Sequence, residues 1–291
     1  MSGVVLITGG AGSVGRALTN RLRTDGWVVR VFDLPNCDFS GLEGVAGIEV
    51  WKGDITDTGD VQRAVQGIDA LIHLAALLPP LSEQDRERTF AVNVQGTANL
   101  LEALEKTNPQ GVFIFSSSVS TYGDTSQTPP PVTVDRPQQA LDIYAESKIA
   151  AEQCLRNASL PTVILRIAPI AVPAFQEPPA IWPFQAEQRV EMVHRDDVVE
   201  ALYQAVKVRE AWGKILNIAG GKSWQKRGRD YVHDLYQLIG VPLEEARFRQ
   251  DPGWVDWYDT TESQHLLHYQ RTSYAQYLSQ LRTLLEELFA E

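Results

Sequence analysis

The chain has 291 residues, of which 44% are hydrophobic and 22% charged, the composition of an ordinary globular protein with room for one large domain or one and a half. Its formal net charge of −11 argues against binding to nucleic acids or anionic membranes, because both are polyanions. The two cysteines lack metal-type spacing, which disfavours a metal site. An apolar segment begins within the first four residues, which leaves no room for a signal peptide, and no apolar run is long enough to span a membrane. These features favour a cytoplasmic protein.

A glycine-rich stretch follows the first apolar run, Val4–Ile7, which has the pattern of a strand buried on both faces. Helical periodicity begins just after it, over Arg16–Leu22. The first glycine allows a sharp turn, the second leaves space for a pyrophosphate, and the third lets the helix pack closely on the strand. The amides that open the helix then face the phosphates. The predicted contacts here are Gly9, Gly12, Ser13, Val14 and Gly15.

Asp33 ends the second predicted strand, Trp27–Phe32, and lies 18 positions after Gly15. A dinucleotide fold places an acid near this point, where it accepts both hydroxyls of the adenosine ribose and repels a 2′-phosphate. Neither Arg nor Lys occurs in the next three residues, so NAD is favoured over NADP as the cofactor. Capping of a helix or loop is the alternative role for this carboxylate.

The third and fourth predicted strands are Ile48–Lys52 and Ala70–Leu74. Asp54 would meet the adenine amino group or cap the next helix, and the sequence leaves both roles open. His73 is expected to bond to backbone, and the small residues after the fourth strand suit a backbone that approaches a ligand closely. The further predicted cofactor contacts in this part of the chain are Asp54, Ile55, Leu74, Ala75 and Ala76.

A long helical stretch from about Glu83 to Lys106 precedes a fifth strand, Gly111–Phe115, which delivers Ser118 at its carboxyl end. Ligands bind at that end of the strands in an open parallel sheet. The alternation of strands and helices predicts an α/β fold, a doubly wound parallel sheet of the Rossmann type with right-handed crossovers.

Tyr144 and Lys148 are four residues apart, which places both side chains on one face of a helix. A tyrosine hydroxyl normally titrates near ~10, and a neighbouring ammonium together with an oxidised nicotinamide ring would favour the phenolate and lower that pKa. Ser118 supplies a hydroxyl that could hold the same substrate oxygen.

Several motifs taken together resemble those of the extended short-chain dehydrogenase/reductases, and within these the NAD-dependent epimerase/dehydratase family. The motifs are Thr8–Gly15, His73–Ala76, Asn93–Thr97, Phe115–Gly123 and Tyr144–Lys148. The resemblance covers roughly residues 3–220. It implies that Tyr144 is the acid/base, that Lys148 binds the nicotinamide ribose and orients the phenol, that Ser118 holds the substrate oxygen, and that Asn93 lies near the cofactor.

Three departures from the family pattern narrow the expected reaction. Dehydratases of the family carry an Asp-Glu pair where this chain has Val119 and Ser120, so dehydration is disfavoured. The segment 165–173 lacks the Tyr-Gly-Pro and the asparagine common in nucleotide-sugar enzymes. Only 28 positions separate Arg166 from His194, which indicates a small substrate lobe.

We expect a NAD-binding Rossmann domain over residues 1–168 and a substrate-binding lobe over 169–291, with a segment near 190–220 returning to the first domain. The lobe contains an aromatic and proline-rich loop. Its aromatic side chains either cover a pocket or pack an irregular segment. Near the C-terminus, the Trp254–Gln264 stretch, rich in aromatics and acids, could stack on a substrate, with core packing as the default. The substrate contacts predicted beside Ser118 are Ser120, Phe175, Trp182 and Arg189.

The predicted function is NAD-dependent hydride transfer between nicotinamide and a carbinol or carbonyl carbon of a sugar, polyol or related hydroxy compound. Nucleotide-sugar epimerisation, as in UDP-glucose 4-epimerase, is the alternative, and a non-enzymatic NAD(P)-sensing regulator is a third possibility. The resemblance also implies a homodimer formed through the helices over 83–106 and 144–157.

Overall fold

The computed structural model describes residues 3–174 and 176–290 and divides the chain into two compact units. Unit 1 contains the chain up to Ser118 together with Asp142–Arg166 and Val199–Leu216. Unit 2 contains Val119–Leu141, Ile167–Val198 and the chain from Asn217 onward. The loop between the fifth strand and the Tyr144 helix thus groups with the second unit, a division that local sequence patterns do not encode.

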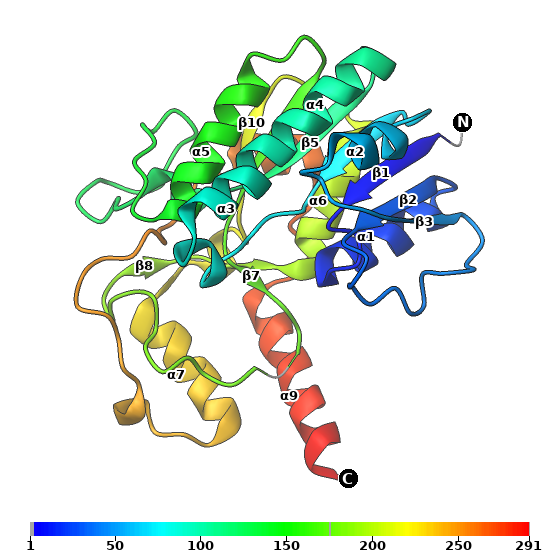
Figure 1. Ribbon diagram of the computed structural model, residues 1–291. Coiled ribbons are helices and arrows are strands. Elements are labelled where there is room, and N and C mark those ends of the chain that lie inside the picture. The colour runs from blue at the N-terminus through cyan, green and yellow to red at the C-terminus, as the bar shows by residue number, and fades with distance from the viewer. Residues whose placement is uncertain (1–2, 175, 291) are drawn as a thin grey trace. The chain divides into compact units, whose positions relative to one another are not determined.

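A seven-stranded sheet forms the centre of unit 1, with strand order β10-β6-β5-β4-β1-β2-β3 (Figure 1). Its strands are β1 (Val4–Thr8), β2 (Val28–Asp33), β3 (Ile48–Lys52), β4 (Ala70–His73), β5 (Val112–Ser118), β6 (Thr162–Ile167) and β10 (Ile215–Ile218), the last two ending in the part assigned to unit 2. β1 pairs in parallel with both β2 and β4, so the strand order reverses direction beside β1. That switch point is where open α/β sheets bind their ligands, and the predicted doubly wound sheet is confirmed.

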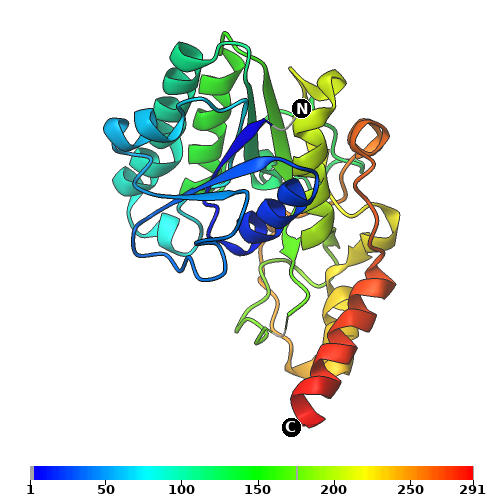
Figure 2. The same cartoon turned by 90° about the vertical axis from the view of Figure 1, so that its right-hand side faces the viewer.

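Helices cover both faces of this sheet, as Figure 2 shows, with α1 and α6 on one side and α2, α4 and α5 on the other. Two side-chain hydrogen bonds join α1 to α6. Arg21 in α1 donates to Glu200 at 3.2 Å, and Tyr203 donates at 2.6 Å to Asp25, the residue that follows α1. The helices of unit 1 are α1 (Ser13–Thr24), α2 (Thr58–Ala64), α3 (Arg86–Phe90), α4 (Gly96–Thr107), α5 (Ile143–Arg156) and α6 (Arg195–Lys207), the last beginning in the part assigned to unit 2.

The long helical stretch expected over 83–106 is interrupted. A 3-10 turn at Leu81–Glu83 precedes α3, and a π-helical turn at Ala91–Gln95 separates α3 from α4. The π turn holds Asn93, whose side chain is buried and bonds outside the helix. Such widened turns occur frequently at functional sites.

Unit 2 has an aromatic core and two small sheets. β8 (Arg189–Val190) pairs antiparallel with β11 (Lys226–Arg227), and β7 (Ile170–Ala171) pairs parallel with β9 (Val193–His194). Its helices are α7 (Gly228–Ile239), α8 (Thr261–Leu267) and α9 (Tyr274–Ala290). The core includes Trp182, Phe184, Trp224, Tyr231, Tyr274 and Tyr277.

No helix in the described parts of the chain is long and apolar enough to cross a membrane. Among the same residues, no three His, Cys, Asp or Glu side chains gather in a group that could hold a metal ion.

Candidate active site

The glycine turn between β1 and α1 has the geometry that dinucleotide binding requires. Gly9 has φ +68°, and a Cβ there would lie 2.7 Å from the backbone nitrogen of Ala75. A Cβ on Gly15 would lie 2.6 Å from the carbonyl oxygen of Gly9, so this position also excludes a side chain. A Cβ on Gly12 would meet only that same oxygen, at 3.3 Å. The second glycine therefore keeps open a space that the protein itself does not fill, and this cradle fits a pyrophosphate.

The start of α1 supplies the donors for such a group. Gly12 is its N-cap residue and makes no side-chain capping bond, and the first turn contains no acidic residue. Gly12 and Ser13 are exposed, Val14 is half-buried and Gly15 is buried. Uncapped amides at the positive end of the helix dipole form an anion site.

Asp33 lies at the carboxyl end of β2, as predicted, and is tied to the glycine turn. Its Oδ2 accepts from the backbone N–H of Ala11 at 3.0 Å, and its Oδ1 accepts from Leu34 N–H at 2.9 Å. Asp54 is half-buried and accepts from Thr56, whereas the N-cap of α2 is Asp57. The alternative role of Asp54 as a helix cap is therefore wrong.

The carboxyl end of β4 is held by side chains. His73 bonds to the hydroxyls of Thr8 at 2.6 Å and Thr97 at 3.0 Å, and not to backbone as expected. Burial, aided by the cation of Lys148, lowers the pKa of this imidazole to about 3, so the ring is neutral. The residues that follow, Leu74, Ala75 and Ala76, are half-buried, while Ile55 is a buried core residue.

Asn93 fastens the chain after β4 to the helix that carries Tyr144. Its amide oxygen accepts from Leu77 N–H at 2.7 Å, and its amide nitrogen donates to the Leu77 carbonyl at 3.1 Å and to Ser147 Oγ at 2.9 Å. Its side chain thus holds the backbone of Leu77, in the loop after β4, against α5.

Lys148, Tyr144 and the end of β5 meet in unit 1. Lys148 Nζ donates to the Ser116 carbonyl at 2.8 Å and lies 5.7 Å from the centre of the Tyr144 ring. Lys148 is 2% exposed, and Ser118, two residues beyond Ser116 on the same strand, is 7% exposed. A hydroxyl, a phenol and an ammonium are thereby supplied from β5 and the first turns of α5.

Burial changes the pKa values of this pair. It lowers the pKa of Lys148 to about 7, against the opposing charge of Glu152. It raises the pKa of Tyr144, with a further contribution from the carboxylate of Asp142. The lowering of the tyrosine pKa expected from an ammonium and an oxidised nicotinamide ring together stays a prediction, and burial of the phenol by the protein acts in the opposite direction.

Glu83 is a site residue that the sequence analysis missed. Its carboxylate accepts from the backbone N–H groups of Ile143 at 2.9 Å and Tyr144 at 3.1 Å, and Asp142 accepts from Ala145 at 2.7 Å. Two carboxylates thus satisfy the first amides of α5, at the helix end where negative charge is stabilising. Its position after an irregular loop gave no periodic signal to find it.

A buried ion pair behind the site was also missed. Glu152, fully buried one turn after Lys148, accepts from the guanidinium of Arg166 at 2.8 Å and 3.0 Å and from Ser117 Oγ at 2.6 Å. These bonds join α5 to β5 and β6 and keep the pKa of Glu152 low despite its burial.

The remaining predicted substrate contacts belong to unit 2. Ser120 is fully buried in a 3-10 turn, and Phe175 lies outside the described residues. Trp182 packs against Phe184 and Tyr231 and lines an apolar cavity of about 160 Å³ next to α7 and α9. These contacts agree with the second interpretation of this loop, in which Trp182 packs an irregular segment.

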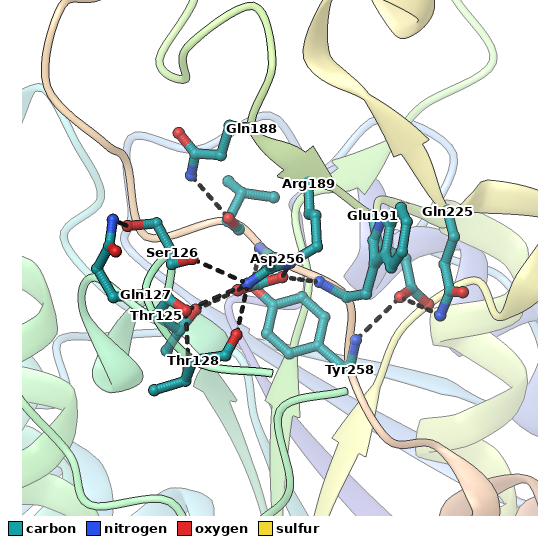
Figure 3. Close-up of polar contacts among 12 residues, drawn as sticks. Thr125, Ser126, Gln127, Thr128, Gln188, Arg189, Glu191, Gln225, Asp256 and Tyr258 are labelled. Atoms are coloured by element: carbon teal, nitrogen blue, oxygen red, sulfur yellow. Dashed lines mark hydrogen bonds and ion pairs between the residues drawn. The ribbon is translucent and has the colours of Figure 1, made fainter. Parts of the chain in front are cut away.

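Arg189 has a structural role, as Figure 3 shows. Its guanidinium bonds to both carboxylate oxygens of Asp256, at 2.5 Å and 2.9 Å, and donates to the carbonyls of Thr125 and Thr128. The nearby Glu191, fully buried, accepts from the backbone N–H of Tyr258 at 3.0 Å. The aromatic segment near residue 256 therefore joins the 125–128 loop to β8. Its Asp256 pairs with the guanidinium of Arg189, which we predicted to contact the substrate.

The model of the NAD dependent epimerase/dehydratase family matches residues 5–173, more than half of the chain. The chain belongs to this family. A 3 beta-hydroxysteroid dehydrogenase/Delta 5-->4-isomerase of Mycobacterium tuberculosis is 37% identical over 156 residues, which are 52% of this chain and 41% of that protein. A UDP-glucose 4-epimerase of Streptomyces lividans is 33% identical over 160 residues, 53% of this chain and 47% of that protein. The chain thus matches less than half the length of each of these relatives.

Solved structures agree with this placement in the epimerase/dehydratase family. A short-chain dehydrogenase/reductase superfamily protein from Agrobacterium tumefaciens, solved with bound NAD, superposes with a TM-score of 0.81 at 25% identity. The match covers 99% of this chain and 98% of that one. The predicted fold and the predicted cofactor, NAD, are confirmed.

Proposed function

We propose that this protein is a NAD-dependent oxidoreductase that moves a hydride between nicotinamide and a carbinol or carbonyl carbon. The observation that carries the proposal is the placement of Lys148 Nζ, 2.8 Å from the Ser116 carbonyl and 5.7 Å from the Tyr144 ring centre. A phenol and an ammonium beside a serine-ended strand of a dinucleotide-binding sheet are suited to proton transfer at a substrate oxygen.

The glycine turn, the opening amides of α1 and Asp33 would hold the adenosine diphosphate half of NAD. Ser13, Val14, Asp54, Leu74, Ala75, Ala76 and Asn93 are further proposed contacts around it. When bound, the nicotinamide ring supplies the hydride acceptor or donor.

Tyr144 exchanges the proton of the substrate oxygen. In the reduction direction its phenol donates to the carbonyl oxygen, and the raised pKa supports that protonated state. In the oxidation direction the ionised form of Tyr144 would take the hydroxyl proton as the carbinol becomes a carbonyl, and a bound NAD would supply the hydride acceptor. Ser118 hydrogen-bonds to the same oxygen, and Lys148 orients the phenol and stabilises negative charge there.

Nucleotide-sugar epimerisation is the second candidate, supported by the 33% identity to a UDP-glucose 4-epimerase. The two reactions differ in the fate of the ketone, which leaves in a dehydrogenase and is reduced again in an epimerase. Incubation with NAD and a panel of free and nucleotide-linked hydroxy compounds separates them, because a dehydrogenase accumulates NADH and an epimerase converts its substrate without net NADH.

The decisive variant is Tyr144→Phe, which removes only the phenol hydroxyl and keeps the ring. We expect NAD binding to be unchanged by calorimetry and turnover to fall by at least about a hundredfold. Turnover that survives this substitution would disprove the acid/base role. NAD binding without turnover in the wild type would favour a non-enzymatic sensor.

The protein is further proposed to form a homodimer in the cytoplasm. The support for the dimer is the family resemblance and the arrangement of α4 and α5 side by side in unit 1 (Figure 1). Sedimentation of the wild type as a dimer, and of a variant with Ile149→Arg on the half-buried flank of α5 as a monomer, is the expected result. A monomeric wild type would refute the dimer.

A further inference from the structure

Four consecutive apolar residues lie exposed in the loop that follows β4. They are Leu78, Pro79, Pro80 and Leu81, named here the apolar loop; the leucine side chains are 56% and 57% exposed. Scattered exposed leucines are common in proteins, but a consecutive exposed run is unfavourable unless something covers it.

The apolar loop is held in place at both ends. Before it, the Asn93 side chain bonds to both backbone groups of Leu77, at 2.7 Å and 3.1 Å. After it, Ser82 is fully buried and Glu83 bonds to the backbone N–H groups of Ile143 and Tyr144. The leucines are thus presented on a fixed loop and not on a segment that could fold them inward.

Both anchors lead to the helix of the proposed acid/base. Asn93 also donates to Ser147 Oγ at 2.9 Å, and Glu83 bonds to the backbone of Tyr144 itself. The segment that contains the apolar loop therefore starts at the carboxyl end of β4, where ligands bind in this type of sheet, and its Glu83 contacts the first turn of α5.

The chemistry of the loop favours one kind of occupant. From Leu74 to Leu81 no residue carries a charge or a side-chain hydrogen-bonding group. A phosphate or polyol placed against the two leucines would lose hydration without gaining a partner. An apolar ring would bury the leucines and be stabilised by the area removed from water.

We infer that the apolar loop selects a hydroxy compound whose carbinol carbon belongs to an apolar ring body, and that Leu78 and Leu81 are its specificity-determining contacts. The inference rests on the proposed oxidoreductase function and specifies its substrate class.

The test uses the full chain with NAD and four probe alcohols: cyclohexanol, 2-decalol, threitol and UDP-glucose. We expect NADH formation to be fastest with 2-decalol, and Leu78→Gln/Leu81→Gln to lower kcat/KM for it by about tenfold or more, chiefly through KM. The matched control is Leu288→Gln, whose side chain is 58% exposed on α9 and which should leave kcat/KM unchanged. Calorimetric titration of 2-decalol into the NAD complex should show the same loss of affinity in the double variant.

Three results would overturn the inference. The first is faster turnover of threitol or UDP-glucose than of 2-decalol, which would leave the oxidoreductase proposal intact. The second is a double variant that no longer forms dimers but has an unchanged kcat/KM for 2-decalol, which would show that the loop contacts another copy of the chain. The third is the absence of both binding and turnover of 2-decalol. Failure of the oxidoreductase proposal itself shows differently, as full activity in Tyr144→Phe.

Discussion

The carboxylate of Glu83 accepts a hydrogen bond from the backbone N–H of Tyr144 at 3.1 Å, across 61 positions of sequence. The same carboxylate accepts from Ile143, so it replaces the missing acceptors at the start of α5. A side chain on the loop after β4 thereby fixes the turn of helix from which the phenol projects.

Replacement of this carboxylate should therefore affect catalysis as well as stability. Glu83→Ala should cost about 1 kcal/mol in the free energy of unfolding and lower kcat by severalfold, while Glu83→Gln, which keeps one acceptor oxygen, should lie between. The control is Asp57→Ala, which removes the comparable cap of α2 and should cost a similar free energy without changing kcat. Equal effects of the two caps on kcat would show that Glu83 acts only on stability.

Substitutions at two glycines of the turn should have different effects, one on the stability of the fold and the other on cofactor binding. A methyl group on Gly15 would lie 2.6 Å from backbone atoms, so Gly15→Ala should destabilise the protein by several kcal/mol. A methyl group on Gly12 would meet one carbonyl oxygen at 3.3 Å, so Gly12→Ala should fold with a loss of about 1 kcal/mol and yet bind NAD at least about tenfold more weakly. Thermal unfolding and NAD titration measure the two effects, and normal NAD affinity in Gly12→Ala would contradict the assigned cradle.

Loss of the Glu152 charge should be costly because its partner is buried. In Glu152→Gln the guanidinium of Arg166, 1% exposed, loses the charge of this buried partner, and we expect a cost of about 3–5 kcal/mol in urea unfolding. Glu102→Gln breaks a pair with Lys106 whose side chains are both 66% exposed, and should change the free energy of unfolding far less, because water screens exposed charges. Similar costs for the two substitutions would be inconsistent with a dry pair behind the site.

Lys148 should make stability depend on pH. Its pKa falls from 10.5 to about 7 on folding, so between these values the unfolded chain binds more protons than the folded chain. The free energy of unfolding contributed by this residue therefore rises with pH from about 7 toward 10.5. Relative to Lys148→Met, the wild type should gain stability over that interval in denaturant unfolding, and Lys106→Met on the exposed face of α4 provides the baseline. A difference independent of pH would show that Lys148 remains charged when buried.

Local patterns determined the architecture of unit 1. The apolar run of β1 predicted a central strand, because a strand buried on both faces must be apolar throughout. The half-buried edge strand Ile48–Lys52, whose sequence is mixed, also has the predicted limits in the structure. The glycine spacing and the four-residue spacing of Tyr144 and Lys148 likewise express geometry within one turn and one helix.

Tertiary structure decided everything that depends on a distant partner. Glu83 caps a helix far along the chain, Asp256 pairs with Arg189, and burial raises the pKa of Tyr144. A sequence shows which groups can ionise or donate, but solvent exposure and long-range contacts set the free energy of each charge. The sequence alone thus determined the fold and the dinucleotide turn, and only the folded chain decided which side chains are available for chemistry and which hold the structure together.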